Sequence, residues 1–310
     1  MRIRIASSWR ELEGMRSQWQ ALARAVPATM FQSFEWNLLA ARIFANREAP
    51  YVVFCENDSG AALIPACVGT RSRTISLLGE ELFDYRDYLA AGDELALHAA
   101  WEKLADLGLP LEVTALRGRD AYERWAWLSP EPFCGAPAAR PGPGVKPKSS
   151  YVLRRLLRRG ASVQQHGPAN QDLVRWIFER KAEQEGSLFR DPLRRAFMLA
   201  AVQLPVSPAE IFTLEFETQT LAALVTFMDA GVRRFYTTYF DAAWAKHSPG
   251  FALLSEAAER TLSDGCAYDF MTGEQQYKMR LATVTVPLYR ISQRRIDMRN
   301  LRTHETTLAA

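Results

Sequence analysis

The sequence predicts an α/β protein with mixed sheets, in which strands and helices follow one order twice. Its 310 residues fit two domains at roughly 150 residues each. In both halves, short alternating segments typical of strands are interspersed with amphipathic segments typical of helices. Six prolines fall within positions 130–147, close to the middle of the chain. Because proline continues neither a helix nor a central strand, this segment is predicted to be a connector.

The first half opens with the alternating segment 2–5, a predicted strand. Apolar residues spaced three and four apart then predict an amphipathic helix: Trp9, Leu12, Met15, Trp19 and Leu22. A second helix is expected over 30–44, and strands over 51–56, 61–68 and 74–78.

The second half repeats this order. A strand is expected at 162–165, helices near 173–180 and 187–201, and strands near 211–217, 221–229 and 233–240. Ala61 to Ile64 matches Ala222 to Val225 at an offset of 161, and Phe31 matches Phe189 at 158. This near-constant offset predicts a duplicated unit.

The chain has a net charge of +3, but its basic residues are concentrated in two stretches. Seven Arg or Lys and no acid lie between 135 and 160, and residues 290–302 carry a local +4. This indicates a local anionic partner, or a solvated linker and tail, and not a DNA-binding protein.

Within the first stretch, four arginines recur at helical spacing: Arg154, Arg155, Arg158 and Arg159. Such a face suits coenzyme phosphates, an acidic membrane surface or tRNA. The absence of an RNA-binding aromatic motif disfavours tRNA.

Several classes of site are excluded by missing motifs. Cys55, Cys67, Cys134 and Cys266 stand singly, and no His pair has ligand spacing, so we expect reduced thiols, no metal and a cytoplasmic protein. No apolar run is long enough to span a membrane, and the start lacks a signal region. GxGxxG, P-loop, HExxH and GxSxG patterns are also absent.

One segment combines a strand, a turn and a helix in a way that suits phosphate. A strand ending at Phe240 is followed by Ser248, Pro249 and Gly250, which open a helix expected over 251–262. Free N–H groups and the positive dipole end at a helix start suit a pyrophosphate, although the same residues also form an ordinary helix cap. A strand over 266–271 follows, ending at Gly273.

These residues carry a resemblance that extends into both halves. The run consists of Tyr236, Asp241, Ser248-Pro249-Gly250, Leu254, Gly265, Tyr268-Asp269-Phe270, Gly273 and Tyr277-Lys278. Together with FQSFEW and LFDYRDYL in the first half, it resembles the CelD/BcsL-type acyltransferases of the GNAT superfamily.

The resemblance implies two GNAT-like domains in tandem, as in the related FemAB aminoacyl transferases. Residues 1–135 would form the domain on the acceptor side, 136–150 a linker, 151–292 the acyl-CoA-binding domain and 293–310 a basic tail. An acyl-CoA, most simply acetyl-CoA, would be the co-substrate, without a metal. The loop AKHSPGF has fewer glycines and basic residues than the usual pyrophosphate loop, so Lys246 and His247 would supply its charge.

Residue roles follow from this resemblance and from side-chain chemistry. The catalytic candidates are Asp269, Tyr277, Lys278 and His247. The cofactor-binding candidates are Lys246, Ser248, Gly250, Phe251 and Tyr239. The substrate-binding candidates are Asp84, Tyr85, Asp87, Tyr236 and Glu274. For Asp269 and the 84–88 run a capped turn is the competing interpretation, and for Tyr277 and Lys278 it is core packing and a surface lysine.

The predicted function is transfer of an acyl group to an amine or hydroxyl of a carbohydrate, as in polysaccharide biosynthesis, or of a small metabolite. The alternatives are a FemAB-like aminoacyl transferase that uses charged tRNA, and a non-catalytic module that binds a saccharide or nucleotide. Peripheral membrane association stays open, and the sequence predicts no oligomeric state.

Overall fold

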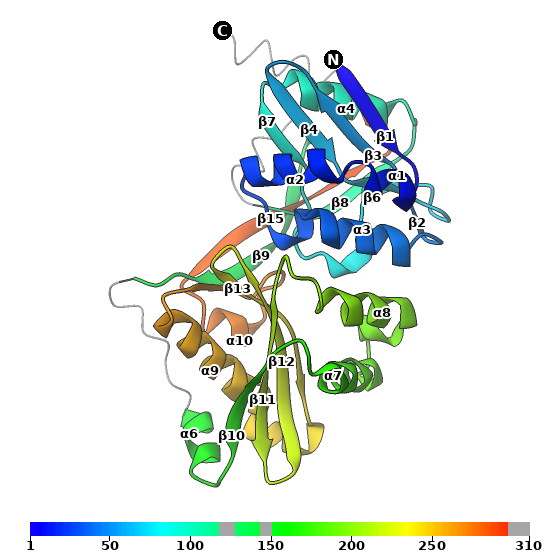
Figure 1. Cartoon of the computed structure of the whole chain (residues 1–310). Helices are drawn as coiled ribbons and strands as arrows, with labels where there is room; N and C mark the ends of the chain where they lie inside the picture. Colours follow the sequence, from blue (N-terminus) through cyan, green and yellow to red (C-terminus); the bar gives the residue numbers. More distant parts are fainter. Residues whose placement is uncertain (118–127, 143–150, 297–310) are drawn as a thin grey trace. The chain divides into compact units, whose positions relative to one another are not determined.

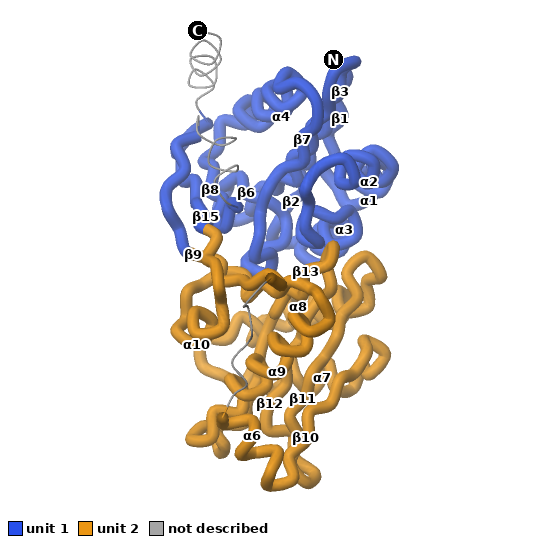
Figure 2. Tube along the Cα trace, turned by 90° about the vertical axis from the view of Figure 1, so that its left-hand side faces the viewer, with its two compact units in different colours: residues 1–134, 287–310 blue, residues 135–286 orange. Residues whose placement is uncertain are grey.

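The computed structural model describes residues 1–117, 128–142 and 151–296, which form two compact units. Unit 1 comprises Met1–Cys134 and Pro287–Ala310, and unit 2 comprises Gly135–Val286 (Figure 2). Strands β9 (Glu131–Ala139) and β15 (Val284–Gln293) each begin in one unit and end in the other. Much of the predicted linker, and the tail from 297, lie outside the described residues.

Unit 1 contains an antiparallel sheet in the order β1-β3-β4-β7. Its strands are β1 (Arg2–Ala6), β3 (Val52–Glu56), β4 (Gly60–Ile64) and β7 (Leu89–Gly92). The helices packed with it are α1 (Trp9–Glu13), α2 (Arg16–Ala25), α3 (Phe34–Ile43) and α4 (Leu95–Ala105). Figure 1 shows these elements in blue and cyan.

Both faces of this sheet are buried. Successive strand residues point to opposite faces, and each of the two sets packs in its own core. Val53 and Cys55 of β3 join a core with Trp101 of α4. Val52 and Phe54 pack instead with residues of α1, α2 and α3.

Unit 1 also contains the strands β2 (Glu48–Pro50), β5 (Ala66–Gly69), β6 (Ile75–Leu77) and β8 (Leu111–Arg117). The strand predicted over 61–68 is two strands, because Pro65 has no N–H and the chain passes there from one sheet to the next. The helix predicted through 9–22 is divided into α1 and α2 at Gly14, whose N–H donates to the Glu11 carbonyl.

Unit 2 has the sheet order β10-β11-β12-β13-β14, with β9 next to β14. Its strands are β10 (Ser162–His166), β11 (Ala209–Phe216), β12 (Gln219–Asp229), β13 (Val232–Phe240) and β14 (Ala267–Asp269). Its helices are α6 (Tyr151–Leu157), α7 (Gln171–Glu183), α8 (Pro192–Ala201), α9 (Pro249–Ser263) and α10 (Gln276–Met279). Helix α9 covers one face of the sheet, and α7 and α8 lie on the other (Figure 1).

The helix boundaries in unit 2 follow from capping residues. The Asn170 side chain accepts from the Leu173 N–H at the start of α7, and Asp191 caps α8, with Pro192 in its first turn. Pro249 opens α9 after Ser248, which has left-handed dihedrals (φ 43°, ψ 50°). The apolar face of α9 then packs against β12, β13 and α6.

The order of elements is duplicated, as the sequence predicts. Unit 1 from β1, and unit 2 from β10 after α6, each have a strand and a helical segment, then a 3₁₀ turn, a second helix and antiparallel strands. Phe31 lies in the turn η1 (Met30–Gln32) and Phe189 in the equivalent turn η4 (Leu188–Arg190). Leu63 and Leu224, which the offset of 161 matches, lie in β4 and β12, and each of these strands pairs with an antiparallel strand on both sides.

The expectation that the proline-rich segment contains no strand is wrong, because β9 includes Pro132 and Pro137. The Pro137 carbonyl accepts from the Phe270 N–H (2.9 Å), a bond for which a proline needs no N–H. Ala138 and Ala139 then pair with β14.

Candidate functional site

Unit 2 contains a cavity of about 420 Å³ at the start of α9. Its walls come from α7, the end of β13, the loop that follows β13, the first turns of α9, and α10. The lining residues are Lys181, Gln184, Thr238, Phe240, Ala245, Ser248, Pro249, Gly250, Phe251, Leu254 and Tyr277. No acidic side chain lines it within the described residues.

The cavity exists because two parallel strands separate. β13 and β14 pair only from Val232 to Arg234, and Arg234 opposite Asp269 is the last pair. β14 then ends, while β13 continues to Phe240. A β-bulge at Tyr236 also shifts the register between β13 and β12. The second half of β13 therefore has an edge that no strand covers in the described part of the chain.

The start of α9 presents two backbone donors to this cavity. Pro249 has no N–H, and the Ala252 N–H already donates to the Ser248 carbonyl (3.0 Å). The N–H groups of Gly250 and Phe251 have no backbone acceptor among the described residues. They lie at the positive end of a helix of 15 residues, which favours an anion.

Lys181 lines the cavity and is not among the residues predicted from the sequence. Its Nζ donates to the Thr238 carbonyl (3.2 Å) at the uncovered part of β13. Burial lowers the pKa of Lys181, and no carboxylate pairs with it in the described structure. A signal was present in the sequence: Val174, Ile177 and Phe178 form the buried face of α7, and position 181 continues that face.

Tyr277 is the catalytic candidate that lines the cavity. Its side chain is 38% exposed, and burial raises its pKa above the ordinary value of 10.0. The phenol is therefore protonated at neutral pH and is able to donate a proton.

Of the cofactor-binding candidates, the structure places Ser248, Gly250 and Phe251 in the cavity wall. Lys246 and His247 lie beside it in the 3₁₀ segment η5 (Ala242–His247), whose Ala245 is also a lining residue.

Asp269 lies outside the cavity lining and is 8% exposed. It forms a short ion pair with Arg234, whose Nε also contacts the Asp229 carboxylate (3.1 Å). Its other oxygen accepts from the Met271 N–H (2.6 Å). These contacts connect the end of β14 to β13, and both oxygens of the Asp269 carboxylate take part in them.

Lys278 and Glu274 also hold the loop between β14 and α10. The Lys278 Nζ donates to the carbonyls of Phe270 (2.9 Å) and Thr272 (2.6 Å). Glu274 accepts from the Gly135 N–H (3.0 Å), where an added Cβ would lie 2.7 Å from the Glu274 carboxyl carbon.

The two tyrosine candidates of β13 pack against neighbouring elements. Tyr236 contacts Phe227 of β12 edge-on, with ring centroids 5.6 Å apart. Tyr239 contacts Trp176 of α7 in the same way at 5.2 Å. Neither is among the described residues that line the cavity.

Asp84, Tyr85 and Asp87 belong to unit 1, in which Tyr85 and Asp87 are buried. The Gln32 Nε2 donates to the Tyr85 carbonyl (2.9 Å), which joins the two sequence segments of the resemblance. Arg117 lies near the Asp87 carboxylate (3.7 Å) and over the Tyr85 ring. Asp84 is half-buried.

Comparison with known proteins agrees with this architecture. Residues 147–279 match the model of the Acetyltransferase (GNAT) domain. A tandem GNAT protein from the clavulanic acid biosynthesis pathway is 10% identical, with a TM-score of 0.57 over 96% of this chain and 99% of that one. The fold is a tandem GNAT fold.

Two further structures share the tandem GNAT fold of this chain. A conserved protein of unknown function from Bacteroides thetaiotaomicron has a TM-score of 0.59 at 11% identity, covering 94% of this chain and 100% of that one. L-PGS from Bacillus licheniformis has a TM-score of 0.56 at 9% identity, covering 92% and 95%. No curated protein matches the chain in sequence.

At these identities the neighbours establish the fold alone. The matching model describes the GNAT domain in general, so the CelD/BcsL-type assignment stays a prediction. Unit 2 of this tandem GNAT fold contains the whole matched segment and the cavity. No group of His, Cys, Asp and Glu suited to a metal occurs in the described residues, and no described helix is long and apolar enough to cross a bilayer.

Proposed function

We propose that the chain is an acyl-CoA-dependent acyltransferase, most simply an acetyltransferase, whose donor binds in the cavity of unit 2. The acceptor is an amine or hydroxyl of a carbohydrate, as in polysaccharide biosynthesis, or of a small metabolite. The observation that carries the proposal is the cavity between the uncovered edge of β13 and the start of α9.

Each part of this cavity suits a part of the donor. The Gly250 and Phe251 N–H groups provide a place for pyrophosphate at the helix start. The free edge of β13 offers backbone groups to the amides of an extended pantetheine arm, as a neighbouring strand would. Lys181 adds a positive charge to an acid-free lining.

The proposed reaction needs little covalent machinery. The acceptor lone pair attacks the thioester carbonyl carbon, and the C–S bond breaks when the tetrahedral intermediate collapses. Tyr277 donates its phenolic proton to the departing thiolate. In this proposal the oxyanion is stabilised by backbone N–H groups of β13 near the Tyr236 bulge.

The other catalytic candidates are less suited to remove a proton. Asp269 is paired with Arg234, and Lys278 donates to two carbonyls. The Nδ1 of His247 is occupied by Arg155. A neutral amine forms the new bond before it passes its proton to water, and the Tyr277 phenolate is reprotonated from water. This arrangement favours an amine over a hydroxyl acceptor. Of the substrate-binding candidates in unit 1, Asp84 is half-buried, whereas Tyr85 and Asp87 are buried.

The test is release of free thiol from acetyl-CoA in the presence of a panel of amino sugars, polyamines and hydroxyl-bearing saccharides. The proposal expects acceptor-dependent turnover that ribonuclease leaves unchanged. Turnover that requires charged tRNA would support the FemAB-like alternative. Saccharide binding without consumption of any acyl donor would support the binding module.

Tyr277→Phe removes the proposed acid and keeps the ring. We expect kcat to fall about 10- to 100-fold with little change in the KM for acetyl-CoA, because general acid catalysis typically contributes at least that much. Since burial raises the Tyr277 pKa above 10.0, the ratio of wild-type to variant kcat should stay constant between about pH 6 and pH 9. Tyr51→Phe in unit 1 is the matched control and should retain wild-type kcat. Wild-type kcat in Tyr277→Phe would refute the role.

A further inference from the structure

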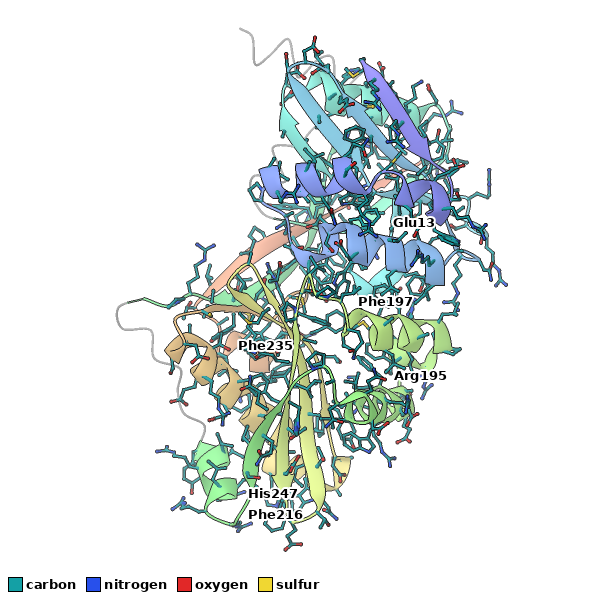
Figure 3. All side chains as sticks on the ribbon, viewed as in Figure 1. Glu13, Arg195, Phe197, Phe216, Phe235 and His247 are labelled. Atoms are coloured by element: carbon teal, nitrogen blue, oxygen red, sulfur yellow. The ribbon has the colours of Figure 1, made fainter. Side chains whose placement is uncertain are left out.

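A cluster of basic side chains borders the cavity where α9 begins. We call Arg155, Arg159, Lys246 and His247 the basic rim. Arg155 comes from α6, which packs on α9, and Lys246 and His247 from η5. Figure 3 labels His247 close to Phe216 at one end of unit 2, and Trp244 contacts both rings.

One hydrogen bond determines which nitrogen of the His247 ring carries the proton. An Nη2 of Arg155 lies 2.9 Å from the Nδ1 of His247. Because arginine only donates, Nδ1 accepts, and the neutral imidazole carries its proton on Nε2. Partial burial and the nearby charges of Arg155, Lys246 and Arg159 lower the pKa of His247. The ring is therefore a neutral N–H donor among cations.

The positive charges of the rim have no acidic partners in the part of the chain that the structure describes. Neither Arg155, Arg159 nor Lys246 forms an ion pair within the described residues, and the same holds for the exposed Arg154 and Arg158. The Arg155 Nε is shielded from solvent and lacks a hydrogen-bond partner in the described structure.

Three arginines on the helices α7 and α9 of unit 2 differ in this respect. Arg175 pairs with Asp172, Arg180 with Glu183, and Arg260 with Glu256. Clustered charges left uncompensated raise the local positive potential, which favours a multiply charged anion.

The position of the basic rim indicates which anion it binds. Ala245 and Ser248 flank Lys246 and His247 along the chain, and both line the cavity. A volume of about 420 Å³ is near the lower end for pockets that enclose a drug-sized ligand. Coenzyme A is much larger than such a ligand, so its nucleotide end must lie outside, past the start of α9.

We propose that the basic rim binds the phosphomonoester on the ribose of the donor's nucleotide end, with Arg155 as the principal contact. This inference rests on the proposed acyl-CoA donor and names the residues that select it. Guanidinium groups match phosphate oxygens in a fork geometry, and the Nε2–H of His247 adds a neutral donor. The rim thus distinguishes coenzyme A from otherwise identical molecules that lack this phosphate.

The test compares acetyl-CoA with acetyl-dephospho-CoA by calorimetry on the wild-type chain and on Arg155→Met. For the wild type we expect about 10-fold or greater weakening when the phosphate is absent, because a hydrogen bond to a charged group contributes at least that much. Arg155→Met should bind the two ligands within about 2-fold of each other. Arg175→Met removes an arginine that has its own acidic partner and should keep the wild-type preference.

Three outcomes overturn the inference. Equal binding of both ligands by the wild-type chain would refute the phosphate contact but would not contradict the proposed donor site. A preference that survives in Arg155→Met assigns the contact elsewhere. Absence of binding by either ligand refutes the acyl-CoA donor and the rim with it. If Arg155→Met fails to fold, the wild-type comparison stands alone and Arg155→Lys, which keeps the charge without the fork, is expected to retain part of the preference.

Discussion

Gly250→Trp is expected to weaken acetyl-CoA binding by at least about 30-fold, or about 2 kcal/mol. Gly250 is buried in the first turn of α9 and lines the cavity. An indole attached there would occupy the space in which the donor is proposed to bind. Calorimetric titration of the variant measures the loss directly.

Gly250→Ala is the matched control at the same position. A Cβ built on Gly250 would lie 3.4 Å from Cδ1 of Phe240 and 3.5 Å from its Cβ, which is close to ordinary packing distance. Phe240 is 42% exposed and has room to adjust. We expect the alanine variant to bind acetyl-CoA within about 3-fold of the wild type, since small changes at accommodating sites cost little. Wild-type binding by the tryptophan variant would show that the donor lies elsewhere.

Asp269→Ala is expected to lower the free energy of unfolding by about 3 kcal/mol, measured by denaturant titration. The change removes one of the two carboxylates that hold the buried Arg234 guanidinium. Breaking a buried ion pair from one side typically costs about 3–5 kcal/mol, and the remaining Asp229 places this case at the lower end. The Met271 N–H also loses its acceptor.

Two further variants separate this structural role from catalysis. Asp264→Ala removes an exposed carboxylate after α9 and should change the free energy of unfolding by less than about 0.5 kcal/mol. Asp269→Asn keeps the shape of the side chain and should lose stability without a selective loss of kcat. Full stability combined with a large fall in kcat would make Asp269 the general base and contradict its structural role.

The duplicated order of strands and helices was predictable because hydrophobic periodicity and turn residues are local properties. Segments such as 162–165 and 233–240 alternate clearly enough to give their strands within one residue of β10 and β13. The prediction for the proline-rich segment was wrong because a local pattern contains no information about distant hydrogen-bond partners. Nothing near Pro137 in sequence reveals that its carbonyl accepts from Phe270, so a strand there looked excluded.

Part of the candidate site could also be predicted. The turn at Ser248 and the helix start at Gly250 are encoded by neighbouring residues, and both line the cavity. Tyr277 was singled out by the resemblance, and it also lines the cavity.

The contacts that bring the cavity and rim residues together could not be predicted, because they depend on packing between distant elements. Lys181 reaches Thr238 across 57 positions of sequence, and Arg155 reaches His247 across 92. The pairing of Asp269 with Arg234 depends on the parallel register of β13 and β14, so the catalytic prediction for Asp269 was made without it. Such pairings are set by the fold and have no local signature.

The most direct test of the acyl-CoA donor is calorimetric titration of the wild-type chain with acetyl-CoA and a series of longer acyl-CoA esters. A donor site at the start of α9 predicts saturable binding of at least one ester with one molecule per chain. Absence of binding by every ester, with the chain shown to be folded, would contradict the acyl-CoA assignment.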